Sequence, residues 1–250
     1  MKIANVAAGN GKPNWSRVCT WLQERRPHIA TLQKTWEEKY FPRDALGDIG
    51  YTGKVLDRRN CSDLGVAILI CRSFPRPVIL PGPKQGEDSR CLTVSIGDLV
   101  VSSVYAPYNP KGEKPKQAIR RRVAWLNRLR DHIADKGYSR EKSLLCGDFN
   151  VKFKADGRRK NEKLYKQDEE DALRELLDLG FCDLYRKIHP NEKGHTRGYK
   201  PNTEGTSRLH LILASKSLAE SCSSVCLDDN PKLWPRPDAP PLIANLDIEV

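Results

Sequence analysis

The feature that most constrains this chain is a short apolar run that stops on polar residues. Residues 144–151 read Leu-Leu-Cys-Gly-Asp-Phe-Asn-Val, and such an apolar run predicts a buried strand. Ligands of α/β layers bind where strands end, so Asp148 and Asn150 are expected at the edge of a sheet. A carboxylate there is a candidate base or metal ligand, and a side-chain amide can orient a phosphate oxygen.

Hydrophobic periodicity predicts further strands and helices on both sides of this run. Strands are predicted at residues 2–7, 28–33, 51–56, 65–71, 91–96, 99–105, 143–147, 208–214 and 242–248, and helices at 15–26, 115–134 and 168–179. Gly97-Asp98 predicts a hairpin turn, and Asn14 a helix cap. The order of elements predicts an α/β fold in which two mixed β-sheets pack together with helices outside, as a single domain over residues 1–250.

The helix predicted at residues 115–134 has an apolar face. The residues expected to point inward are Ile119, Val123, Leu126, Leu129 and Ile133.

Targeting signals are not apparent. The first apolar run is too short for a signal peptide, and no window reaches the roughly 18 apolar residues of a membrane span. The eight cysteines include no Cys-x-x-Cys pair typical of zinc sites. Without a secretory signal they are expected to be buried, reduced thiols, which predicts a cytoplasmic protein that does not contact a membrane.

The charge indicates a polyanionic partner. The formal net charge is +11 and the pI is near 9.3. Basic runs recur at residues 58–59, 111–116, 120–122 and 152–163. Each run alone is typical of a solvated face, but four of them on one domain favour nucleic acid as the partner.

Several segments together resemble the exonuclease III family of DNA-repair nucleases, or abasic-site endonucleases, within the endonuclease/exonuclease/phosphatase superfamily. The segments are residues 1–4, 26–33, 41–42, 65–69, 104–107, 147–150, 176–183, 208–209 and 241–244. The resemblance covers nearly the whole chain. It implies a four-layer α/β sandwich whose active site lies at one end of the two sheets, and a magnesium-dependent hydrolysis of DNA phosphodiesters.

Part of the family's catalytic set is present. By the resemblance, Asp148 and Asn150 match the pair that handles the attacking water, and Tyr105 matches the tyrosine on the leaving side. Asp238 matches the Asp of a terminal Asp-His pair and remains as a remnant metal ligand.

Other positions depart from the family pattern. Ala7 stands where the resemblance implies an Asn, Lys34 where it implies the metal-binding Glu, His210 where it implies the Asp that orients a His, and Ala239 where it implies the catalytic His. An aromatic pair expected near the damaged nucleotide is replaced by Arg197-Gly198.

Lys34 is the substitution with the largest physical consequence. A cation where the metal's carboxylate should be repels the ion, by roughly 4 kcal/mol for unit charges ~4 Å apart at an effective dielectric near 20. We expect its ammonium to sit between Asp148 and Asp238 and to make a metal-free polar cluster.

The alternative is that neighbouring residues restore the missing functions, with Glu37 or Glu38 as the carboxylate and His210 in place of the absent His. Asn5 faces the same side as Ala7 but is about 7 Å further along the strand, too far for the same ligand role.

The sequence therefore predicts an exonuclease III-type DNA-repair protein that binds DNA but has lost or severely weakened phosphodiester hydrolysis. If the protein is inactive, no cofactor is expected. If it is active, Mg²⁺ is the expected cofactor. The expected partner is double-stranded DNA, damaged DNA included, bound by a monomer. Candidate phosphate contacts are Arg90, Lys116, Arg121, Lys154 and Arg197.

Two alternatives remain open. One is an active Mg-dependent exodeoxyribonuclease or abasic-site endonuclease, which Asp148, Asn150, Tyr105 and Asp238 favour. The other is a non-catalytic scaffold or regulatory partner, in which these polar residues persist because they hydrogen-bond one another.

Overall fold

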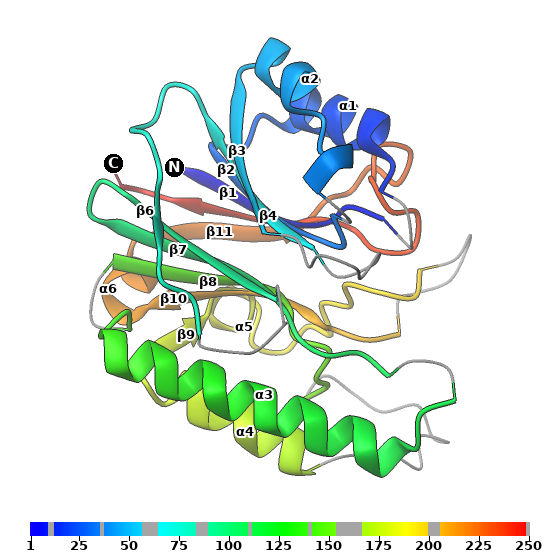
Figure 1. The fold of residues 1–250 in the computed structure, drawn as a ribbon, viewed down its shortest axis with the longest axis vertical. Coiled ribbons are helices and arrows are strands. Elements are labelled where there is room, and N and C mark those ends of the chain that lie inside the picture. The colour runs from blue at the N-terminus through cyan, green and yellow to red at the C-terminus, as the bar shows by residue number, and fades with distance from the viewer. Residues whose placement is uncertain are drawn as a thin grey trace.

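Two six-stranded β-sheets pack face to face in the computed structural model (Figure 1). The structure describes residues 1–9, 13–35, 38–56, 65–83, 90–109, 112–139, 142–153, 167–199 and 206–248. The first sheet has the order β11 (Cys222–Leu227), β12 (Leu242–Leu246), β1 (Lys2–Ala7), β2 (Ile29–Gln33), β4 (Val66–Cys71), β3 (Tyr51–Leu56). The second has the order β5 (Val78–Leu80), β6 (Cys91–Ile96), β7 (Leu99–Tyr105), β8 (Lys142–Asp148), β10 (His210–Ser215), β9 (Phe181–Asp183).

Helices cover the outer faces of both sheets (Figure 1). α1 (Trp15–Arg25) and α2 (Arg43–Asp48) lie over the first sheet, and α3 (Pro115–Lys136) and α4 (Gln167–Leu177) lie over the second. The short elements are η1 (Glu38–Tyr40), α5 (Leu184–Ile188) and α6 (Lys216–Glu220). The predicted fold class, two mixed sheets packed together with helices outside, is confirmed. No helix in the described part of the chain is both long and apolar enough to cross a membrane.

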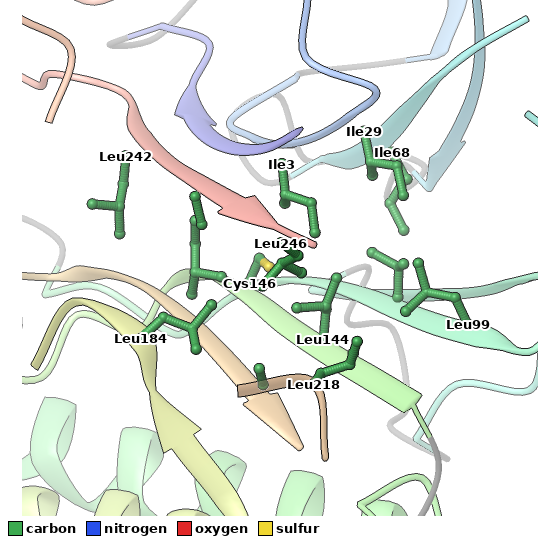
Figure 2. Close-up of a cluster of buried hydrophobic side chains, with 14 of the residues drawn as sticks. Ile3, Ile29, Ile68, Leu99, Leu144, Cys146, Leu184, Leu218, Leu242 and Leu246 are labelled. Atoms are coloured by element: carbon green, nitrogen blue, oxygen red, sulfur yellow. The ribbon is translucent and has the colours of Figure 1, made fainter. Parts of the chain in front are cut away.

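The apolar core lies between the sheets, as Figure 2 shows. Ile3, Ile29 and Ile68 of the first sheet face Leu99 and Leu144 of the second. Two further clusters fill the space between each sheet and its helices. Burial on both faces explains why these strands read as nearly continuous apolar runs.

Alternation along the strands decides which side chains reach the space between the sheets. In β8, Leu144 and Cys146 belong to the central core, whereas Leu145 packs toward the outer helices. Asp148 is two residues beyond Cys146 and therefore points inward as well. The predicted strand thus carries its terminal carboxylate between the two sheets.

The predicted cap of α1 is confirmed, since the Arg17 N–H donates to Asn14 Oδ1 at 3.1 Å. The helix ends at Arg25, and its C-cap Arg26 comes directly before Pro27. β5 and β9 were missed because they have only three residues each. β11 was missed because its buried residues, Cys222 and Val225, are three positions apart and give no strand alternation.

The buried face of α3 differs from the prediction. Leu126, Leu129 and Ile133 are buried as expected, whereas Ile119 and Val123 are half-buried. Ala118, Arg122 and Trp125 are buried in this part of the helix. Arg122 can be buried because it pairs with Glu169 of α4 and donates to the Pro107 carbonyl at 2.7 Å.

Candidate active site

The facing surfaces of the two sheets change from apolar to polar at one end. Strand register places the polar residues side by side there. Tyr105 of β7 and His210 of β10 are both in register with Asp148 of β8, and Ala7 of β1 is in register with Gln33 of β2. Strand ends from both sheets therefore meet at one site, at the end where β7 and β8 finish.

Asn5 joins the two sheets just below this site. Its Nδ2 donates to the Gly147 carbonyl at 3.0 Å and to the Leu211 carbonyl at 3.1 Å, and its Oδ1 accepts from Thr31 Oγ1 at 3.2 Å. All three bonds are buried, so the amide is used to hold the sheets together. Ala7, the next residue on the same face, is buried and brings no polar group to the site.

Asp148 is the centre of the site and is 0% exposed. Its Oδ1 accepts from the Asn150 N–H at 3.1 Å, and its Oδ2 lies 3.3 Å from Lys34 Nζ and 3.7 Å from His210 Nε2. Burial by itself raises the pKa of Asp148, but Lys34, His210 and Arg197 outweigh that effect and leave the pKa below its usual value. The carboxyl is therefore ionised at neutral pH.

Lys34 follows β2 and reaches across to the second sheet. Lys34 is 7% exposed, and its Nζ lies over the Tyr105 ring, 5.1 Å from the ring centroid. Burial lowers the pKa of Lys34, Asp148 opposes this, and Arg236 and Arg197 lower it further. The ion pair with Asp148 thus holds a lysine in a place where burial would otherwise disfavour its charge.

Asp238 does not complete the predicted arrangement. We expected Lys34 to neutralise both Asp148 and Asp238, but Asp238 is bound by Arg236, whose Nη2 donates to Asp238 Oδ2 at 2.9 Å. Burial raises the pKa of Asp238, while Arg236 and Arg197 lower it below its usual value. Arg236 is two residues before Asp238, which allows this local pairing and leaves Lys34 to Asp148.

Arg236 is the functional candidate that the sequence analysis missed. Arg236 is 2% exposed, and its Nη1 has no hydrogen-bond partner among the described residues. The signal in the sequence was an arginine next to a predicted site carboxylate. Ala239 is buried, and its backbone N–H donates to the Arg236 carbonyl at 3.1 Å, so a methyl group stands at the position predicted to have lost a histidine.

His210 cannot act as a cation at neutral pH. Burial, with Lys34, Arg236 and Arg197 adding to it, lowers the pKa of His210 to about 4, although Asp148 acts the other way. Within the described part of the chain, neither ring nitrogen has a hydrogen-bond partner. His210 is thus a neutral imidazole beside Asp148. It occupies the strand position where the family resemblance implies an Asp.

Arg197 is held beside these residues by its backbone neighbours. Thr196 Oγ1 accepts from the His210 N–H at 3.0 Å, and the Gly198 N–H donates to the Asp238 carbonyl at 2.9 Å. The charge of Arg197 lowers the pKa of Asp148 and Asp238 as well as that of Lys34. Arg197 is half-buried.

Lys34 and Asn150 both have left-handed backbones, with φ of 65° and 52°. Such conformations are uncommon outside glycine and persist where surrounding contacts hold them. Asn150 is held by its Nδ2, which donates to the Ala106 carbonyl at 2.8 Å. These two residues lie on either side of Asp148, in the same site.

The other predicted phosphate contacts have different surroundings. Arg90 is buried, with its guanidinium 5.5 Å from the Tyr105 ring centroid. Arg121 donates to the Tyr108 carbonyl at 2.6 Å and pairs with Glu113 at 2.8 Å. Lys116 is exposed on α3, and Lys154 lies outside the described residues. Arg197 and Arg90 are therefore the predicted contacts that reach the site.

The described donors do not fit a magnesium ion. Mg²⁺ requires several oxygen ligands in near-octahedral geometry, and no group of three or more His, Cys, Asp or Glu side chains in the described ranges is arranged to hold a metal. The Lys34 ammonium lies against Asp148 Oδ2 instead. Glu37 and the Glu38 side chain, the predicted substitutes, fall outside the described residues.

Two mixed sheets packed face to face, with a polar site at the ends of inner strands, agree with the architecture that the resemblance to the endonuclease/exonuclease/phosphatase superfamily implied. The sequence model described as the Endonuclease/Exonuclease/phosphatase family matches residues 4–232. The chain therefore belongs to this family.

Curated relatives are DNA enzymes. The chain is 28% identical over 185 residues to the DNA repair nuclease APEX1 of Danio rerio, covering 69% of this chain and 57% of that protein. It is 26% identical over 148 residues to the exodeoxyribonuclease of Bacillus subtilis (strain 168), covering 55% of this chain and 57% of that one. Both alignments thus span well under two thirds of the relatives' length.

Solved structures match over the whole chain. An AP endonuclease from Archaeoglobus fulgidus superposes with a TM-score of 0.84 at 29% identity, covering 99% of this chain and 100% of that one. The 3' phosphatase NExo from Neisseria, bound to product DNA hairpin, superposes with a TM-score of 0.82 at 23% identity over the same shares. The second match is evidence for the fold alone.

Proposed function

We propose that this protein is an exonuclease III-type DNA-binding protein whose phosphodiester hydrolysis is lost or severely weakened. The observation that carries the proposal is the ion pair between Lys34 Nζ and Asp148 Oδ2 at 3.3 Å. The pair places a cation against the carboxylate that would align or deprotonate the attacking water. The cation comes from the position where the family resemblance implies a metal-binding Glu.

Hydrolysis of a phosphodiester in such a site needs charge stabilisation and a proton acceptor. A divalent ion supplies several kcal/mol of transition-state stabilisation, and a unit positive charge ~4 Å away opposes its binding by roughly 4 kcal/mol at an effective dielectric near 20. Ala239 has no donor for an oxyanion, and the loss of one such donor typically slows a reaction by about 10²–10³. These deficits act on the same step, so we expect a rate close to background.

DNA binding does not need the catalytic set. Phosphate contacts from Lys and Arg supply most of the sequence-independent affinity, and this chain has a formal net charge of +11. Relatives support DNA as the partner, since one is named a DNA repair nuclease and another an exodeoxyribonuclease. We extend the proposal to double-stranded and damaged DNA, bound by a monomer without resident magnesium.

Residual nuclease activity is the second candidate. Asp148, Asn150 and Tyr105 converge at the site, and His210 Nε2 is 3.7 Å from Asp148 Oδ2. A catalyst would need Lys34 to leave Asp148 so that a metal ion or a water molecule could take its place.

Nicking of an abasic-site duplex tests the two candidates. The purified protein is incubated with the duplex in EDTA and in a magnesium series, with the active-site variant Asp148→Asn as a control for contaminating nuclease. We expect nicking indistinguishable from that of Asp148→Asn under all conditions. Magnesium-dependent nicking that Asp148→Asn abolishes would instead establish an active nuclease.

A further inference from the structure

Lys34 is a buried lysine in the middle of the polar site. A surface lysine extends its amine into water, whereas the amine of Lys34 lies against the second sheet, 3.3 Å from Asp148 Oδ2 and 5.1 Å from the centroid of the Tyr105 ring. The backbone φ of Lys34 is 65°, a conformation that collects at functional sites because the surrounding structure has to hold it there. The fold therefore presents a primary amine where the polar residues of both sheets meet.

The surroundings of Lys34 are those that make a lysine amine nucleophilic. A lysine becomes a nucleophile where burial or a neighbouring cation disfavours its ammonium form. Burial lowers the pKa of Lys34, and Arg236 and Arg197 lower it further, although Asp148 opposes them. Lys34 thus meets both conditions.

A proton acceptor stands next to this amine. Asp148 Oδ1 accepts from the Asn150 N–H at 3.1 Å, and the other carboxylate oxygen, Oδ2, faces Lys34 Nζ. His210, a neutral imidazole, has its Nε2 3.7 Å from the same Oδ2. A nucleophile within reach of a base, with a further group beside the base, is the arrangement that covalent catalysis uses.

We propose that Lys34 forms a Schiff base with an aldehyde of damaged DNA, such as the ring-opened sugar of an abasic site. The inference rests on the proposed function, in which this chain binds damaged DNA and Lys34 takes the side of the site where a metal ligand is implied. An abasic nucleotide has lost its base, so it brings less bulk to a buried side chain than a complete nucleotide does. Formation of the imine requires no metal ion.

The reaction balances within the site. The Lys34 ammonium gives one proton to Asp148 Oδ2, and the nitrogen lone pair forms a bond to the aldehyde carbon. The hydroxyl of the resulting carbinolamine takes the proton back from Asp148 and leaves as water. The product is a protonated imine, so the ionised Asp148 again faces a positive charge.

The buried position of Lys34 favours the imine once it has formed, because exclusion of water slows hydrolysis of a reactive intermediate. The imine by itself breaks no phosphodiester bond. Covalent capture of an abasic site is therefore compatible with the expected absence of nicking.

Trapping with sodium cyanoborohydride in EDTA tests the Schiff base, because this reagent reduces an imine to a stable amine that joins protein to DNA. The substrate is a duplex with one abasic site, and the control is the same duplex whose abasic aldehyde has been reduced to an alcohol. We expect a covalent complex with the aldehyde duplex alone. Peptide mass spectrometry of that complex should place the adduct on Lys34.

A matched pair of variants connects the complex to this residue. Lys34→Arg keeps a cation opposite Asp148 but removes the amine, and it should slow trapping by at least about tenfold. Lys142→Arg is the control, because Lys142 lies at the opposite end of β8, where it pairs with Asp98 at 2.7 Å, and its trapping rate should equal that of the wild type. If Lys34→Arg does not fold, the position of the adduct in the wild-type protein still decides the matter.

Equal trapping by Lys34→Arg and wild type, or adducts confined to other lysines, would overturn the proposal. Failure of the proposed function has a different signature, namely magnesium-dependent nicking that Asp148→Asn abolishes, whereas the imine is trapped in EDTA. An adduct on Lys34 together with such nicking would support the Schiff base and count against the loss of hydrolysis.

Discussion

Lys34 Nζ and Asp148 Oδ2 lie 3.3 Å apart, with side chains that are 9% and 0% exposed. Burial of an ion pair is costly, but removal of one partner costs more because it leaves an uncompensated charge in the interior. This pair is therefore expected to affect both the stability of the fold and, under the proposed function, the affinity of the site for a metal ion.

Removal of the lysine charge should destabilise the protein. In Lys34→Met, the ionised Asp148 loses its closest cation, and we expect the free energy of unfolding in urea to fall by about 3–5 kcal/mol at neutral pH. The double variant Lys34→Met with Asp148→Asn removes the stranded charge and should recover most of that loss. A single variant as stable as wild type would show that Asp148 needs no cation.

Replacement of the lysine by a carboxylate should create a metal preference. Wild-type protein is expected to show no site-specific heat of magnesium binding by calorimetry, whereas Lys34→Glu should bind magnesium at least about tenfold more tightly, a change of about 1.4 kcal/mol. The control is Lys142→Glu, which makes the same change of charge at the far end of β8. Micromolar magnesium binding by the wild type would contradict the metal-free interpretation.

Acid should destabilise the fold through His210. The pKa of His210 is lowered from 6.5 to about 4, so between these values the unfolded chain binds more protons than the folded one. The stability is fully present above about pH 6.5 and is lost as the pH falls toward 4, by about 3 kcal/mol in total. Urea unfolding at a series of pH values measures this loss.

His28 and His132 also have lowered pKa values because of burial, so the wild-type curve alone cannot assign the effect. His210→Gln should flatten the pH dependence, leaving the part due to the other two. An unchanged slope in that variant would show that His210 is not the group that titrates.

DNA affinity should fall steeply with salt, because each neutralised phosphate releases counterions. Arg197 lies at the site, so Arg197→Gln should reduce the slope of log affinity against log salt by about 1. Lys142→Gln should leave the slope unchanged. Anisotropy with one duplex over a salt series provides both slopes, and equal slopes for Arg197→Gln and wild type would remove Arg197 from the DNA contacts.

The inner strands could be predicted because their signal is local. β1, β6 and β7 have the bounds that the apolar pattern predicted. The inward direction of Asp148 follows from its two-residue spacing from Cys146, since alternation is a property of the strand itself. The family resemblance likewise identified Lys34 and Ala239 in the sequence as departures from the family's catalytic pattern.

The sequence by itself thus determined the two-sheet fold and the family, because periodicity and motif order are carried by neighbouring residues, and the resemblance predicted which positions depart from the family's catalytic pattern. The tertiary structure decided which cation meets which carboxylate: Lys34 pairs with Asp148, and Arg236 pairs with Asp238. It also decided that His210 is neutral. Lys34 follows a strand of the first sheet and Asp148 ends a strand of the second, so their pairing depends on the packing of the sheets, which a linear pattern does not contain. Arg236 is close to Asp238 in the sequence, but only the fold shows that Asp238 pairs with Arg236 and not with Lys34.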